Sequence, residues 1–177
     1  MRRFLDRLYA AAAWLAAACL ASIALVMLAQ AGMREFGLLL RGADDIVGWL
    51  CAASAFLALA ATFRHSELVR VGLVIDRLSP ALRRRAELGA LGLAVLVVGY
   101  ILWAAANFVY ESWAFEEVAQ GLIQIPIWIP QLSFVIGALV FFVAVLDEFV
   151  VLARGGTPAY RRVEQQHRAG MDLGEAP

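Results

Sequence analysis

Four apolar segments of transmembrane length dominate this sequence. They cover about residues 8–33, 46–63, 88–110 and 128–152. An α-helix rises about 1.5 Å per residue and the hydrocarbon core of a bilayer is about 30 Å thick, so even the shortest segment, roughly 27 Å long as a helix, just spans it. Hydrophobic residues make up 63% of the chain, whereas a soluble domain has roughly 45–50%. These features predict an all-α integral membrane protein with four transmembrane helices, within a membrane domain of residues 1–153.

The first segment has to be distinguished from a signal peptide, because basic residues precede it. Its apolar stretch from Leu8 to Met33 is interrupted only by Ser22 and Gln30. The apolar core of a signal peptide has only about 7–15 residues. We therefore expect a retained membrane helix, which has to tilt or protrude because its length is roughly 39 Å.

Arginine is distributed very unevenly among the links. Of the fifteen arginines, thirteen lie before the first segment, between the second and third, or after the fourth. The other two lie between the first and second segments, and the link between the third and fourth has none. Basic residues that flank transmembrane helices stay on the cytoplasmic side. The pattern predicts that both termini and the link at residues 64–85 are cytoplasmic.

The cytoplasmic link also contains an amphipathic stretch at about residues 67–79. Leu68, Val71, Ile75 and Leu78 recur there at helical spacing. Two interpretations stay open: a short helix in the headgroup plane, with its arginines toward phosphate, or a docking element for a partner subunit. On the outer side, residues 33–42 are too apolar to lie in water and are expected at the interface. The polar tail, residues 154–177, is predicted to be disordered.

Acidic residues gather on the predicted outer side. Asp44 and Asp45 precede the second segment, where a carboxylate can cap the helix and favours its dipole; a role in a subunit interface is the alternative. Glu111, Glu116 and Glu117 lie in the link between the third and fourth segments, which has no basic residue. Simple solvation of these three carboxylates and docking of a soluble partner both remain open.

Several function classes lack their characteristic residues. The centres of the segments carry no charged residue, and such residues usually mark ion paths. The only histidines, His65 and His167, lie in predicted cytoplasmic segments, so paired haem ligands inside the membrane are not expected. The sequence has no phosphate-binding loop, zinc-protease motif or nucleophile elbow, and its net charge is zero. We expect no enzyme, no cofactor in this chain and no nucleic-acid partner.

Small residues mark possible helix contacts. Gly92 and Gly99 are seven residues apart in the third segment, and residues 10–18 of the first are rich in alanine. Small residues let membrane helices approach closely. They can pack within this chain or against another protein. Because four helices without a polar pathway are a poor transporter alone, an external partner is expected.

The whole pattern resembles the small membrane subunit, of the DctQ type, of tripartite ATP-independent periplasmic (TRAP) transporters. The resemblance covers roughly residues 1–153. It rests on the topology, on the acidic pair, on the link pattern Arg-x-x-Glu-x-x-Arg-Val-x-x-x-x-Asp-Arg-Leu-x-Pro, and on the spacing of Pro, Trp, Pro and Gly in the fourth segment. The matching residues are Asp44, Asp45, Arg64, Glu67, Arg70, Val71, Asp76, Arg77, Leu78, Pro80, Pro126, Trp128, Pro130 and Gly137. The family often has His at Leu68 and Asp at Gly72, so polar contacts made there by relatives are not carried over.

The resemblance implies a small permease subunit in a bacterial inner membrane. Such a subunit packs against and stabilises the scaffold of a large permease subunit, which holds the sodium ions. The complex carries out sodium-coupled uptake of an organic acid that a periplasmic binding protein delivers. The residues expected at the subunit or lipid interface are Asp44, Asp45, Arg64, Glu67, Arg70, Asp76, Arg77, Gly92 and Gly99. Glu111, Glu116 and Glu117 are the candidate residues for docking of the binding protein, with simple solvation as the alternative. The alternative function is a haem-free membrane anchor or assembly subunit of another complex.

Overall fold

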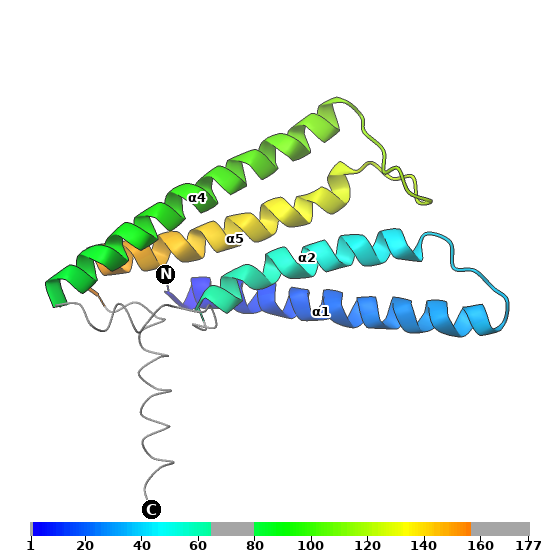
Figure 1. Ribbon diagram of the computed structural model, residues 1–177, viewed down its shortest axis with the longest axis horizontal. Coiled ribbons are helices and arrows are strands. Elements are labelled where there is room, and N and C mark those ends of the chain that lie inside the picture. The colour runs from blue at the N-terminus through cyan, green and yellow to red at the C-terminus, as the bar shows by residue number, and fades with distance from the viewer. Residues whose placement is uncertain (1, 65–79, 157–177) are drawn as a thin grey trace, which may run out of the picture.

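A computed structural model describes residues 2–64 and 80–156, and within these residues the chain forms four long helices (Figure 1). They are α1 (Arg2–Glu35), α2 (Ala43–Arg64), α4 (Pro80–Ala114) and α5 (Trp128–Ala153). All four are long and apolar enough to cross a membrane. The prediction of an all-α fold with four such helices is therefore confirmed. The amphipathic stretch at residues 67–79 and the tail from residue 157 lie outside the described residues.

The helices extend beyond the apolar segments that predict them. α1 has 34 residues and α4 has 35, which corresponds to about 50 Å each. α4 begins at Pro80 because the first position of a helix needs no backbone donor, so proline is accepted there. An ion pair between Arg83 and Glu87, with 3.3 Å between Nε and Oε1, supports the added first turns. Hydropathy marks the part of a helix that fits the bilayer, while hydrogen bonding lets the helix continue past it.

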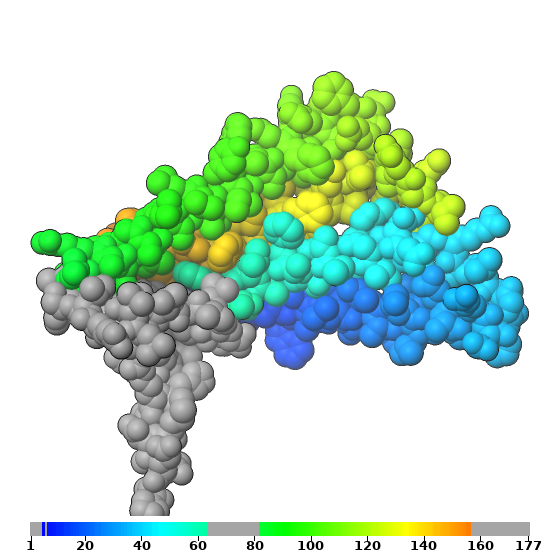
Figure 2. Space-filling model, in the orientation of Figure 1, coloured from blue at the N-terminus to red at the C-terminus, as the bar shows by residue number. Residues whose placement is uncertain are grey.

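The helices form a single layer in the order α1, α2, α5, α4 (Figure 1). The hairpins α1–α2 and α4–α5 are joined along α2 and α5, whereas α1 makes only slight contact with α5. Of the residues in the most apolar stretch of each helix, 39% are buried in α5 and 28% in α2. The share is 11% in both α1 and α4. The two outer helices are therefore the open edges of the layer, as the space-filling view also shows (Figure 2).

The contact between α2 and α5 is the centre of the layer. Ala60, Ala144 and Val145 are almost completely buried there. Gly137 brings the backbones together, since a Cβ atom at this position would lie 2.6 Å from the carbonyl carbon of Phe56. The ring of Phe56 also packs on Phe134, with 5.1 Å between centroids. Close backbone approach thus fixes where the two helices cross.

Candidate functional site

One carboxylate joins distant parts of the chain at the end of the layer where the α1–α2 and α4–α5 loops lie. Asp45, in the first turn of α2, accepts hydrogen bonds from the backbone N–H groups of Leu122 and Ile123, at 2.8 and 3.2 Å from Oδ2. Both donors belong to the loop between α4 and α5. Hydrogen bonds to a charged acceptor are stronger than neutral ones, so Asp45 attaches this loop to the start of α2.

Two glycines make this attachment possible. A Cβ atom on Gly121 would overlap the carboxylate of Asp45. Gly42 has a φ of 82°, which L-residues with side chains rarely adopt, and a Cβ there would lie 2.5 Å from Cγ1 of Ile123. The loop therefore rests directly on the backbone at the start of α2.

The other member of the acidic pair connects α1 to α2. Nε2 of Gln30 donates a hydrogen bond to Oδ1 of Asp44 at 3.3 Å. We use the name loop junction for Gln30, residues 42–45 and residues 121–123. Both carboxylates lie in the first turn of α2, where they suit the helix dipole. The hydrogen bonds of both side chains reach other segments, so the pair also organises the tertiary fold.

The three glutamates Glu111, Glu116 and Glu117 have different surroundings, and Glu111 belongs to α4 rather than to the loop that follows it. Glu111 is exposed near the end of α4. Glu117 is fixed, because its Oε2 accepts a hydrogen bond from Oγ of Ser112 at 2.8 Å and its carbonyl accepts one from the N–H of Ile127 at 3.0 Å. Glu116 has a φ of 52°, an unusual value for a residue other than glycine. The sequence analysis treated the three carboxylates together, whereas the structure gives each of them a separate environment.

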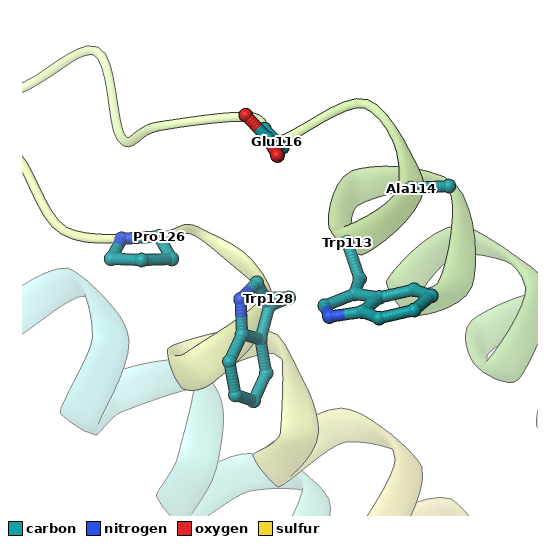
Figure 3. A pocket seen from close by; sticks show the side chains of 5 residues that line it. All are labelled: Trp113, Ala114, Glu116, Pro126 and Trp128. Carbon is teal, nitrogen blue, oxygen red and sulfur yellow. The ribbon is translucent and has the colours of Figure 1, made fainter.

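Glu116 lies beside a cavity of about 580 Å³ between the end of α4 and the start of α5. The other lining residues are Trp113, Ala114, Pro126 and Trp128. Figure 3 shows the two indole rings close to each other, with Glu116 on the loop above them. The cavity therefore combines aromatic walls with one carboxylate, and the sequence analysis did not identify it.

At the opposite end of the layer, Arg84 connects α4 to α5. Nη2 of Arg84 donates to the carbonyl oxygen of Ala153 at the end of α5, at 3.5 Å. This satisfies one of the carbonyl groups that a helix end leaves unpaired. The side chain of Arg64 and the residues Glu67, Arg70, Asp76 and Arg77 lie outside the described part, so their predicted interface role stays a prediction.

Two of the three glycines of α4, Gly92 and Gly99, lie against α5 within this chain. A Cβ on Gly92 would be 3.6 Å from Cε2 of Phe149, and one on Gly99 would be 3.2 Å from Cε2 of Phe142. Both positions therefore allow the phenylalanine rings of α5 to approach α4. The glycine spacing found in the sequence corresponds here to contacts between α4 and α5.

Comparison with known families decides which membrane protein this four-helix layer represents. Residues 23–155 match the family model of the DctQ component of tripartite ATP-independent periplasmic transporters. The chain belongs to the DctQ family. A search of curated proteins gave no match.

The region matched to the DctQ family runs from within α1 to the end of α5, and so contains the loop junction, the cavity and the α2–α5 crossing. This DctQ protein is thus a multi-pass membrane protein and the small permease component of a TRAP transporter. Family membership indicates a transport role rather than catalysis.

Proposed function

We propose that this DctQ subunit packs against the scaffold of a large permease subunit and stabilises it. The observation that carries the proposal is the open layer of helices. α1 and α4 are largely unburied along their most apolar stretches, so an edge or a face of the layer is available to another membrane protein. Tight packing between helices drives such association in lipid, where both surfaces are apolar in any case.

Both edges expose large side chains, such as Trp14 and Leu25 on α1, but α1 also presents a stripe of small ones. On α1, alanines are exposed at positions 10, 17, 21 and 24. On α4, the exposed side chains include Leu96, Tyr100 and Trp103. Small side chains permit close helix approach, while large ones suit lipid. We therefore assign the α1 edge to the large permease and the α4 edge to lipid.

Co-purification tests this assignment. The full-length chain, tagged and extracted from native membranes in a mild detergent, should recover one large polytopic permease in near-equal amount. Ala17→Phe should lower that recovery about tenfold, because overpacking of a close helix contact costs about 1–3 kcal/mol. Val97→Phe, which adds the same ring to the exposed face of α4, is the matched control and should leave recovery unchanged. Recovery of respiratory subunits instead would support the anchor function and contradict the proposal.

The ion and substrate specificity are proposed to reside in the partner subunits. Among the described residues, no group of three His, Cys, Asp or Glu side chains is arranged to hold a metal ion. We propose that the large subunit binds sodium and that the transported compound is an organic acid delivered by a periplasmic binding protein. Uptake of candidate acids by the assembled transporter, with and without a sodium gradient, tests both points. An uptake rate that is the same with and without the sodium gradient would contradict sodium coupling.

The proposed orientation in the bacterial inner membrane has both termini in the cytoplasm. The arginine distribution supports it. A cysteine introduced at Leu38, in the exposed loop between α1 and α2, should react with a membrane-impermeant maleimide added to the periplasmic side. Cys19 and Cys51 have to be replaced by serine first. If the cysteine reacted only after the membrane was permeabilised, position 38 would face the cytoplasm and the proposed orientation would be contradicted.

Docking of the binding protein is proposed to involve Glu111, an exposed acidic residue in the last turn of α4. Glu117 is engaged by Ser112, and Glu116 lines the cavity. Exposed charges act mainly on association rates. Glu111→Arg should therefore slow uptake several-fold at low binding-protein concentration and have little effect at saturation. If the parent transporter and the Glu111→Arg variant showed equal uptake at every binding-protein concentration, Glu111 would not belong to the docking surface.

A further inference from the structure

The cavity between the end of α4 and the start of α5 lies at the depth of lipid headgroups. The apolar stretch of α4 that can cross the membrane ends at Ala114, and that of α5 begins at Trp128. Both residues line the cavity. Tryptophan is enriched at this depth, where an apolar ring and a polar N–H group are both accommodated. Lipid headgroups are therefore the most abundant groups next to this cavity.

The walls of the cavity favour a cation. Trp113 and Trp128 contribute indole rings, whose faces attract ammonium groups more strongly than other side-chain rings do. Glu116 contributes the only charge among the five lining residues. An ammonium group gains from the rings and from the carboxylate, whereas an anionic group meets no basic side chain in the lining and is repelled by Glu116.

The loop holds Glu116 in place. Its φ of 52° is costly for a residue with a side chain. Backbone hydrogen bonds fix this conformation, from the N–H of Glu116 to the carbonyl of Trp113 at 3.2 Å and from the N–H of Glu117 to the carbonyl of Ser112 at 3.0 Å. Within the described residues, no hydrogen bond or ion pair engages the Glu116 carboxylate. The carboxylate is therefore positioned beside the cavity and available to a ligand.

We propose that this cavity binds the ammonium headgroup of a zwitterionic phospholipid. The volume of about 580 Å³ lies within the usual range of small-ligand sites. The ammonium group contacts the indole rings and the carboxylate of Glu116, while the acyl chains follow the exposed side of α4. This role goes beyond the proposed transport function and does not require the large permease.

Native mass spectrometry of the full-length chain tests the proposal. The chain, extracted in a mild detergent, is mixed with equal amounts of phosphatidylethanolamine and phosphatidylglycerol. We expect about tenfold more retained phosphatidylethanolamine, because a contact worth roughly 1.4 kcal/mol gives that ratio. Glu116→Gln and Trp113→Leu should each lower its retention about fivefold, in the range of a partly desolvated cation–π or ionic contact. Circular dichroism verifies that both variants keep their helices.

Glu111→Gln is the matched control, because it removes the same charge from an exposed residue outside the cavity. It should leave phosphatidylethanolamine retention unchanged. Equal retention of the two lipids, or equal effects of the two glutamine variants, would overturn the proposal. So would a Glu116→Gln protein that keeps its lipid but takes up substrate more slowly at low binding-protein concentration, because Glu116 would then contact the soluble protein.

Discussion

Gly137→Leu is expected to separate α2 from α5 and to cost about 3 kcal/mol of unfolding free energy, at the upper end for overpacking of a tight contact. The backbone of Phe56 lies where the new side chain would begin. A backbone cannot move aside as a flexible side chain can, so the two helices have to shift along much of their contact. Titration of the detergent-solubilised protein with SDS, followed by circular dichroism, measures the loss.

Gly89→Leu is the control for this variant. It places the same side chain on a helix glycine whose Cβ position has no atom of another described segment within 4 Å. We expect its unfolding free energy to stay within about 0.5 kcal/mol of the parent protein, or to rise slightly because leucine is the better helix former. If both variants lost the same stability, the close approach at Gly137 would not be what holds α2 and α5 together.

Asp45→Ala should release the α4–α5 loop from the start of α2. The N–H groups of Leu122 and Ile123 lose their shared acceptor, and a hydrogen bond to a charged group contributes about 1.5–3 kcal/mol. Amide exchange at Leu122 and Ile123 should therefore accelerate roughly 30-fold, which corresponds to about 2 kcal/mol. Hydrogen–deuterium exchange of the loop, read by mass spectrometry, gives this value.

Two further variants separate the role of Asp45 from a general loss of charge. Asp45→Asn keeps one acceptor oxygen and should retain part of the protection. Asp44→Ala removes an equal charge but only the 3.3 Å hydrogen bond from Gln30, so the loop amides should exchange at nearly the parent rate. Acceleration of the same size in Asp44→Ala and Asp45→Ala would show that local charge, rather than the two hydrogen bonds, protects the loop.

The sequence predicted the secondary structure well because the bilayer imposes a strict local constraint. In hydrocarbon, each backbone polar group has to be satisfied within its own helix. An apolar run such as residues 128–152 therefore identifies a helix without knowledge of its neighbours, and α5 spans Trp128–Ala153. The bounds of α4 were predicted less accurately. The turns before residue 88 are polar and yet helical, and hydropathy identifies only the apolar part of a helix.

The candidate site was only partly predictable. The acidic pair at Asp44 and Asp45 was identified from its position before the second apolar segment. Its actual partners were not, because Leu122 is 77 residues away from Asp45 and nothing local distinguishes it from other loop residues. Gly121 was also missed, since a glycine required by close approach looks the same in sequence as one that is merely tolerated.

The sequence by itself determined the four apolar helices, the arginine asymmetry and the family pattern, because each depends on local composition along one chain. The tertiary structure alone decided the order α1, α2, α5, α4, the crossing at Gly137 and the cavity beside Glu116. The physical reason lies in the lipid. All four helices are apolar on every side, so hydrophobicity does not specify which faces meet, and only the detailed fit of small and large side chains selects the neighbours.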